Sequence, residues 1–186
     1  MMEISKEKKE KKKRIVPIWV CILIFIGAFF AGMISKVAIK PAWSTKYTAT
    51  WSEELGTKIT DISYGDEEAN KFDLYLPKDS TKDTYGLVIY LHAGGFTSGD
   101  KTDDENMLAW LCSKGYVAAG INYTLRTDTN NASVLLQSNE IKEAIPIVVE
   151  EAKNQGYNID KMTVAGGSAG HALAMIYAYR DAQDAP

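Results

Sequence analysis

Two glycine-rich segments hold the residue types that could do chemistry on a carbonyl group. The first, His92-Ala-Gly-Gly-Phe96, directly follows the apolar run GLVIYL, and the second, Gly166-Gly-Ser168-Ala-Gly170, directly follows MTVA. The second segment has the spacing G-x-S-x-G, in which a serine occupies a sharp turn between a strand and a helix. Small residues on either side of such a serine let the backbone cross closely. The pattern therefore predicts an exposed, potentially nucleophilic Ser168.

The first segment supplies what a nucleophilic serine needs next. When a serine oxygen attacks an ester carbonyl, the carbonyl oxygen becomes an oxyanion, and N–H donors must already point at its position. The N–H of Ala169 follows the serine at the start of a predicted helix, where the helix dipole favours negative charge. The N–H groups of Gly94 and Gly95 are candidates for the other donors.

These segments are set in an alternation of strands and helices. Strands are predicted over residues 59–64, 71–76, 86–91, 116–122 and 162–165, and helices over residues 102–114, 138–154 and 169–180. The first two strands are separated by the turn-rich GDEEAN, which favours an antiparallel pair. Pro146 is expected either to kink the second helix or to mark its true start. Alternation of this kind predicts a mostly parallel sheet flanked by helices, with no internal repeat.

The N-terminal part of the chain is of a different character. Residues 1–14 are strongly basic, and residues 15–35 form a run of 21 residues without a charge. A helix of that length is about 30 Å long, which matches the thickness of a bilayer. We interpret residues 15–35 as an uncleaved signal anchor rather than a cleavable signal, because the run is long and no clear cleavage site follows it. By the positive-inside rule, we expect residues 1–14 to be cytoplasmic and everything after Lys36 to be extracytoplasmic.

Residues 36–58 are expected to form a linker, and residues 59–186 a single domain. From residue 41 onward the net charge is −9 and there is no basic cluster, so nucleic acid is an unfavourable partner. The chain has two cysteines, and Cys21 lies within the apolar run. Cys112 therefore has no partner for a disulfide within the domain. No spacing of histidines and cysteines suggests a metal site, and no cofactor is predicted.

Four segments together resemble a known superfamily. YGDEEANKFDLYLP, VIYLHAGGF, INYTL and GYNIDKMTVAGGSAG, with the spacing between them, resemble the α/β hydrolases, and within these the HGGG-type esterases and lipases of the hormone-sensitive-lipase-like or feruloyl-esterase-like branch. The resemblance covers about residues 62–181. It implies an α/β three-layer sandwich with a mostly parallel sheet, here preceded by one transmembrane helix.

The resemblance also implies roles for individual residues. Ser168 would be the nucleophile, and Gly94, Gly95 and Ala169 would form the oxyanion hole. His92 would organise the loop and would not be the catalytic base. The substrate would be a small-molecule carboxylic ester, and neither a metal nor another cofactor is implied.

Two residues depart from the family pattern near these sites. Ala93 stands where the first glycine of the HGGG run would be, and alanine tolerates a positive φ poorly, so the loop is expected to be subtly reshaped. His171 stands where a small residue is usual. We expect His171 to pack against the sheet rather than to accept the proton of the serine, because it lies beside Ser168 on the same helix. Crowding of the acyl pocket by His171 is the alternative.

The largest departure concerns the catalytic acid and base. In this fold they follow the serine in the order Asp or Glu, then His, each after a later strand. The residues after Ser168 include Asp181, Asp184 and His171 but no further predicted strand. We therefore expect the sheet to be incomplete on its C-terminal side and the 186-residue chain to be weak or inactive as a serine esterase. The alternatives are a non-catalytic, membrane-tethered binding module, or a peptidase or thioesterase of the same fold.

Overall fold

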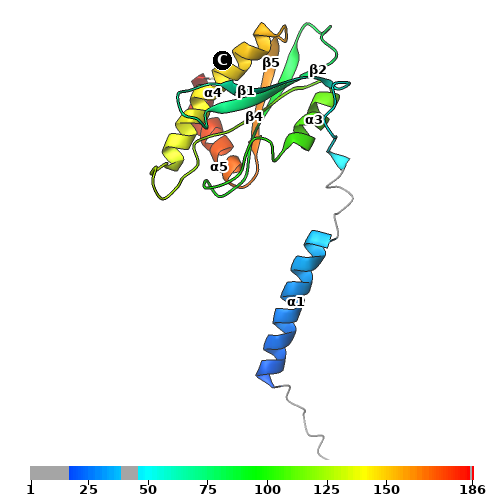
Figure 1. Ribbon diagram of the computed structural model, residues 1–186, viewed down its shortest axis with the longest axis vertical. Coiled ribbons are helices and arrows are strands. Elements are labelled where there is room, and N and C mark those ends of the chain that lie inside the picture. Colours follow the sequence, from blue (N-terminus) through cyan, green and yellow to red (C-terminus); the bar gives the residue numbers. More distant parts are fainter. Residues whose placement is uncertain (1–16, 39–45, 185) are drawn as a thin grey trace, which may run out of the picture. The chain divides into compact units, whose positions relative to one another are not determined.

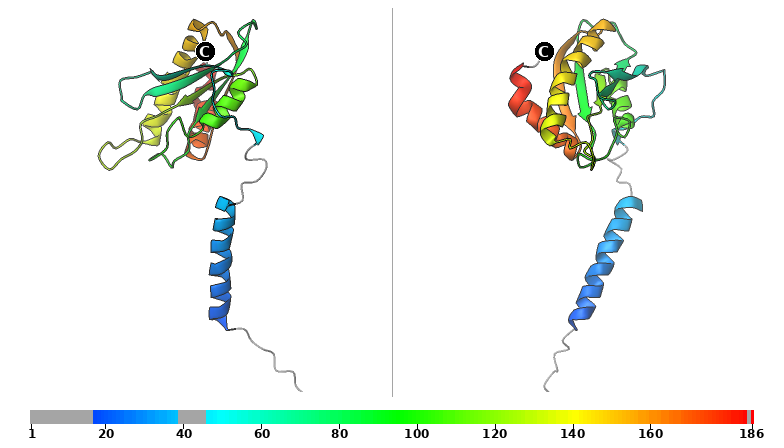
Figure 2. Two further views of the ribbon diagram at one scale, coloured as in Figure 1. Left: turned by 45° about the vertical axis from the view of Figure 1, so that its right-hand side comes forward. Right: turned by 60° about the vertical axis from the view of Figure 1, so that its left-hand side comes forward.

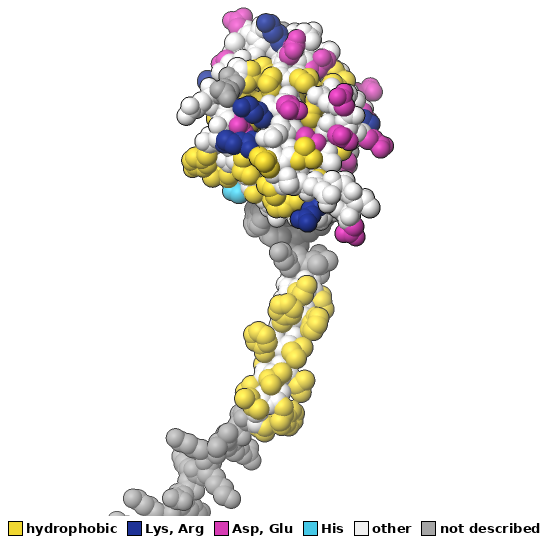
Figure 3. Space-filling view, turned by 90° about the vertical axis from the view of Figure 1, so that its left-hand side faces the viewer, with side chains coloured by type: hydrophobic (Ala, Val, Ile, Leu, Met, Phe, Trp, Pro, Cys, Tyr) yellow, Lys and Arg dark blue, Asp and Glu magenta, His cyan; other side chains and the backbone are white. Residues whose placement is uncertain are grey.

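The computed structural model describes residues 17–38, 46–184 and 186, in two compact units, Met1–Thr45 and Lys46–Pro186. In the first unit, residues Ile18–Ala38 form helix α1, and hydrophobic side chains cover most of its surface (Figure 3). The mean hydropathy over Ile18–Ser35 is 2.5, and none of that window is buried. By length and composition α1 could cross a membrane, a test that a signal sequence also passes. The basic residues 1–14 lie outside the described residues.

The second unit is built on a five-stranded mixed sheet (Figure 1). Its strands, in the spatial order β1-β2-β4-β3-β5, are β1 (Gly56–Ser63), β2 (Lys71–Pro77), β4 (Val117–Ile121), β3 (Tyr85–Leu91) and β5 (Ile159–Gly166). The β1–β2 pair is antiparallel, as its turn-rich connection predicts, and β2 is also antiparallel to β4. Strand β3 runs parallel to both β4 and β5. The predicted α/β fold is confirmed, with parallel pairing confined to β4, β3 and β5.

Helices cover both faces of the sheet, which makes three layers (Figures 1 and 2). Helices α4 (Val134–Asn154) and α5 (Ala169–Ile176) pack on one face, and α3 (Glu105–Ser113) packs on the other. All five residues of β4 are buried, because helices lie over both sides of this strand. On β3, the fully buried Leu87, Ile89 and Leu91 face α4 and α5.

Helix α4 begins earlier than its apolar spacing predicts. The cap is Ser133, whose Oγ accepts a hydrogen bond of 3.1 Å from the backbone N–H of Leu136. The first turn, residues 134–136, is exposed and so contributes nothing to the buried stripe that starts at Gln137. Pro146 lies inside the helix, so the prediction that it might mark the start is wrong.

The last helix is shorter than predicted. Helix α5 ends at Ile176 and continues as one π-helical turn, Tyr177–Asp181, and a short 3₁₀ turn, Ala182–Asp184. The packed unit also begins before residue 59, the boundary expected from the sequence. Trp51 contacts Tyr75 of β2 edge to face, with ring centroids 5.3 Å apart, and the N–H of Ala49 donates to the carbonyl of Asn106 in α3 at 2.8 Å.

The register of the parallel strands determines where the glycine-rich segments meet. Leu91, the last residue of β3, is paired with Ile121 at the end of β4 and with Gly166 at the end of β5. The segments that follow these three strands therefore leave the sheet at the same edge. This is the edge at which open α/β sheets hold their ligands.

Candidate active site

Ser168 lies on a sharp turn between β5 and α5, as the G-x-S-x-G spacing predicts. Its backbone has φ 46° and ψ −108°, a conformation that costs a residue with a side chain about 1–3 kcal/mol. The side chain of Ser168 is exposed. A strained backbone of this kind persists only where surrounding contacts fix it. Here the flanking glycines allow those contacts.

Gly166 and Gly170 allow backbone segments to pass in direct contact. A Cβ atom added to Gly170 would overlap the carbonyl oxygen of Leu91, and one added to Gly166 would overlap the backbone of Gly170. The N–H of Gly167 donates to the carbonyl of Leu91 at 3.2 Å, and the N–H of Gly170 donates back to the carbonyl of Gly167 at 2.8 Å. The turn is thereby fixed against the end of β3, from which the HAGGF segment emerges.

The segment that follows β3 forms a loop over residues 92–101, which we call the 92–101 loop. Its first residue, His92, is buried, and its Nδ1 lies 2.7 Å from the carbonyl oxygen of Ala93. A carbonyl oxygen only accepts, so Nδ1 carries the proton. Nε2 is buried and has no hydrogen-bond partner among the described residues. His92 thus makes its side-chain hydrogen bond inside the loop, and Ser168 is not among its hydrogen-bond partners.

The middle of the 92–101 loop turns sharply at two glycines. Gly94 has φ 131° and Gly95 has φ 61°, both in the left-handed range that favours glycine. The carbonyl of Gly94 accepts from the N–H groups of Thr97 at 3.1 Å and Ser98 at 3.0 Å. Ala93 is not among the described residues with positive φ, so its methyl group strains no backbone there. The expected reshaping of the loop by Ala93 therefore has no basis in its φ angle.

Three N–H groups at this edge of the sheet are available for a ligand. Within residues 46–184, no hydrogen bond uses the backbone N–H of Gly94, Gly95 or Ala169 as donor. Ala169 is the first residue of α5, where N–H groups have no partner inside the helix. The two segments are in contact, since a Cβ added to Gly167 would lie 3.4 Å from the Cβ of Ala93. The sequence names the same three groups as candidate oxyanion donors, and that role stays a prediction.

The 92–101 loop is held by residues that sequence patterns did not single out. The ring of Tyr123 stacks on the imidazole of His92, with centroids 4.3 Å apart and an interplanar angle of 9°. Its hydroxyl donates to the carbonyl of His92 at 2.9 Å, and burial raises the pKa of Tyr123 to about 12, which keeps that donor proton in place. Gln137 of α4 donates through Nε2 to the carbonyls of Phe96, at 2.9 Å, and Thr124, at 2.7 Å. Tyr123 lies in the run INYTL and Gln137 just before the predicted helix 138–154, but neither pattern marks these contacts.

The side chains considered for an acid or a base lie elsewhere. His171 is exposed on α5, which differs from the packing role expected for it. Asp181 is buried and is paired with Arg180 at 2.7 Å and Lys142 at 3.6 Å, and the hydrogen bond from Arg180 lowers its pKa. In the part of the chain that the structure describes, no hydrogen bond joins Ser168 Oγ to a basic group, and no cluster of residues has the composition of a metal site.

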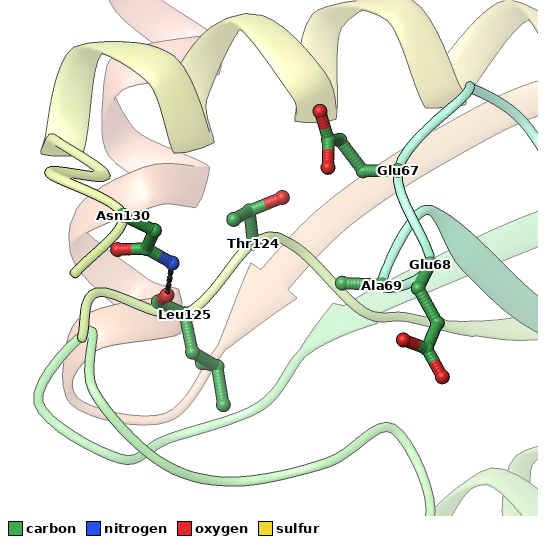
Figure 4. A pocket seen from close by; sticks show the side chains of 6 residues that line it. All are labelled: Glu67, Glu68, Ala69, Thr124, Leu125 and Asn130. Atoms are coloured by element: carbon green, nitrogen blue, oxygen red, sulfur yellow. Dashed lines mark hydrogen bonds between the residues drawn. The ribbon is translucent and has the colours of Figure 1, made fainter.

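A shallow cavity opens at the same edge of the sheet, beyond β4 (Figure 4). Its volume is about 350 Å³, and the residues that line it are Glu67, Glu68, Ala69, Thr124, Leu125 and Asn130. Asn130 Nδ2 donates to the carbonyl of Leu125 at 2.6 Å, which closes the wall formed by the segment after β4. The two glutamates give the other wall a negative charge.

Comparison with known proteins places this chain among esterase-like folds. The family model described as BD-FAE matches residues 72–185. Kynurenine formamidase from Danio rerio is 28% identical over 119 residues, which is 63% of this chain and 38% of that protein. A structure of esterase B from Lactobacillus rhamnosis with a tributyrin phosphonate superposes with a TM-score of 0.61 and 22% identity, covering 89% of this chain and 52% of that one.

A truncated carbohydrate esterase from gut microbiota superposes with a TM-score of 0.56 and 21% identity, covering 67% of this chain and 44% of that one. At these identities the structures show a common fold. The chain spans less than half the length of the curated relatives that it matches.

Proposed function

The chain belongs to the BD-FAE family, and from this premise we propose that it is a serine hydrolase of carboxylic esters with Ser168 as its nucleophile. The observation that carries the proposal is the convergence of an exposed serine on a strained turn with the three N–H groups of Gly94, Gly95 and Ala169, which are without partners among the described residues.

The proposed chemistry is acyl transfer in two steps. Ser168 Oγ attacks the ester carbonyl carbon and its proton passes to solvent water, while the carbonyl oxygen, now an oxyanion, accepts hydrogen bonds from the three N–H groups. Collapse of this intermediate breaks the bond to the alcohol, which leaves after taking a proton back from solvent, and the acyl group remains on Ser168. Water then attacks the acyl group, which releases the acid and restores the serine. Each lost oxyanion donor would slow the reaction by about 10²–10³.

The rate of this chemistry depends on a base. Because no basic group contacts Ser168 Oγ within the described residues, we expect the 186-residue chain to show only the residual activity of an oxyanion hole without a base. The non-catalytic binding module stays the alternative on the same observation. Peptide and thioester substrates need the same nucleophile, and the likeness to kynurenine formamidase adds formamides to the acyl groups to be tested.

We further propose that α1 is a membrane anchor and that the hydrolase unit is extracytoplasmic. The support is the length and hydropathy of α1 and the basic residues that precede it in the sequence. Retention of α1 on the purified protein, with the unit after it accessible to protease added outside intact cells, is the expected result. Release of a form that lacks α1 would instead indicate a cleaved signal.

The test of the nucleophile is covalent modification of Ser168 in the full chain in detergent. A p-nitrophenyl alkylphosphonate forms a bond between Ser168 Oγ and phosphorus, and p-nitrophenolate leaves, which can be followed by colour and by intact mass. We expect one adduct per chain, located at Ser168 and absent from the Ser168→Ala variant. Hydrolysis of p-nitrophenyl acetate and butyrate is measured in parallel, also for a chain extended by any in-frame sequence after residue 186. An unmodified Ser168, or an adduct that persists in Ser168→Ala, would refute the proposal.

A further inference from the structure

The end of the 92–101 loop carries a buried lysine that the proposed chemistry does not use. Lys101 is 6% exposed, and its Nζ lies 2.9 Å from Asp61 Oδ1 and 3.0 Å from Asp73 Oδ1. Asp73 is in β2 and is fully buried. Burial disfavours the charged form of Lys101, but the two carboxylates outweigh it and raise the pKa of the ammonium group. The charged end of Lys101, a residue of the loop, is thus buried against Asp73 of β2.

A buried ion pair adds little net free energy to the contact between two structural elements. Removing each charge from water costs several kcal/mol, and an apolar pair of similar size is often at least as stable. The gain from such a pair is that it favours one geometry, because a displaced ammonium group leaves the buried carboxylate without its closest counter-charge. Asp73 Oδ1 also accepts from the N–H of Asp61 at 2.9 Å, so the lysine meets an acceptor that is already fixed.

The side chain of Asn122 holds both Lys101 and the residue that precedes it. The N–H of Lys101 donates to Asn122 Oδ1 at 2.6 Å, and Asn122 Nδ2 donates to Asp100 Oδ2 at 2.7 Å. Asn122 follows β4 directly, and its neighbour Tyr123 holds the other end of the loop at His92. Consecutive residues of one segment therefore fix the beginning and the end of the loop that contains Gly94 and Gly95.

We propose that Lys101 is a positioning residue for the candidate oxyanion hole: its buried pair with Asp73 fixes the end of the 92–101 loop so that the N–H groups of Gly94 and Gly95 face the substrate of Ser168. This rests on the proposed function. Lys101 touches no reacting atom and acts through the loop. A shift of about 1 Å in such donors is enough to cost about a hundredfold in rate.

The test uses the variant Lys101→Met combined with Asp73→Asn, in the full chain. The pair of changes removes both charges, keeps the side-chain volumes, and leaves an oxygen that accepts from the N–H of Asp61. Lys58→Met is the matched control, because Lys58 Nζ lies 3.9 Å from Asp73 Oδ2 and 2.6 Å from Glu105 Oε1 but belongs to β1 and not to the loop. The measurements are the melting temperature and the saturable kinetics of Ser168 phosphonylation, which separate binding of the reagent from the covalent step.

We expect the double variant to melt as the parent does while the rate of its covalent step falls about tenfold or more, with reagent binding unchanged. Lys58→Met should leave the covalent step unchanged whatever it does to the melting temperature. An unchanged covalent step in the double variant would overturn the inference, as would an equal loss in Lys58→Met. If Ser168 of the parent does not react at all, the proposed function fails, and the inference about Lys101 is then tested by amide hydrogen exchange. The inference requires exchange at Gly94 and Gly95 to be faster in the double variant than in the parent, and unchanged in Lys58→Met.

Discussion

Tyr123 holds His92 by two independent contacts. Its ring lies flat on the imidazole, with centroids 4.3 Å apart, and its hydroxyl donates to the His92 carbonyl at 2.9 Å. The first contact fixes the side chain and the second fixes the backbone, just before the turn at Gly94. Both groups are buried, so neither contact is weakened by competing water.

Removal of the Tyr123 hydroxyl tests the hydrogen bond to His92 while the ring stacking is kept. Tyr123→Phe keeps the stacked ring but leaves the His92 carbonyl without its donor, which should lower the free energy of unfolding by about 1–3 kcal/mol. Tyr157→Phe is the control, since the buried Tyr157 hydroxyl donates at 2.7 Å to the carbonyl of Pro77, at the end of β2 that lies away from the 92–101 loop. Urea unfolding should show comparable losses, and only Tyr123→Phe should slow phosphonylation of Ser168. Equal slowing in both variants would mean that the loop is not held by this bond.

A methyl group at Gly170 tests the close contact behind Ser168. Gly170→Ala places a Cβ against the backbone carbonyls of Leu91 and His92, which cannot move aside as a side chain would. We expect a loss of about 2–3 kcal/mol in unfolding free energy together with loss of Ser168 reactivity. Gly156→Ala, at φ 91° with open space around the new Cβ, should cost about 1–2 kcal/mol for its backbone alone and leave Ser168 reactive. Normal reactivity of Ser168 in Gly170→Ala would contradict the description of the turn.

The turn at Ser168 and the loop at Gly94 were predictable because each depends on local sequence. A serine between glycines, after an apolar strand and before a helix, satisfies the requirements of the turn within five residues. The strands were likewise marked by short apolar runs with turn residues between them. In the structure β4 and β5 both run parallel to β3, and the pairing of Leu91 with Gly166 brings the two segments to one edge.

The contacts that hold the 92–101 loop were not predictable in the same way. Asp73 and Lys101 are 28 positions apart, and in sequence each is an ordinary charged residue; only the crossing of β2 behind the loop buries them together. In the sequence Gln137 is a polar residue just before the predicted helix 138–154, whereas in the structure it is fully buried and donates to two carbonyls. Long-range partners of this kind leave no periodic signal, so the candidate donors were found from sequence and their supports were not.

Acid should release the end of the loop through Asp100. Burial opposes ionisation of Asp100, but hydrogen bonds from Asn122 and Thr102 outweigh it and lower the pKa to about 2 from 3.8. A carboxyl group with a lowered pKa in the folded state stabilises fully above pH 3.8, and that contribution is lost as the pH falls towards about 2. The difference in unfolding free energy between the parent and Asp100→Asn should therefore be constant at neutral pH. It should shrink towards zero as the pH falls from 3.8 to about 2.

A substitution at Asn122 tests the same hydrogen bond from its donor side. Asn122→Ala removes the donor to Asp100 Oδ2 and the acceptor of the Lys101 N–H, so the pKa of Asp100 should rise towards its ordinary value. Urea unfolding as a function of pH, with and without Asp100→Asn in each background, measures this shift. The hydrogen-bond account is wrong if Asn122→Ala leaves the pH at which the difference closes unchanged.

Cys112 reports on how firmly α3 and the segment before β1 are packed. Its thiol is buried, with Sγ 3.8 Å from the carbonyl of Leu55, and burial raises its pKa to about 11. Only the thiolate reacts, so in a Cys21→Ser background the folded chain should resist a disulfide reagent at about pH 8 and react fully in urea.

Trp51→Ala removes a ring that packs on the same cluster as Cys112. It should speed labelling of Cys112 at least tenfold, because local opening becomes less costly. Tyr47→Ala is the control, since Tyr47 is exposed and its ring contacts Trp110 of α3 and Lys46 but does not belong to the buried cluster around Cys112. Rapid labelling of the parent, or equal acceleration in both variants, would show that the segment before β1 is not part of the packed unit.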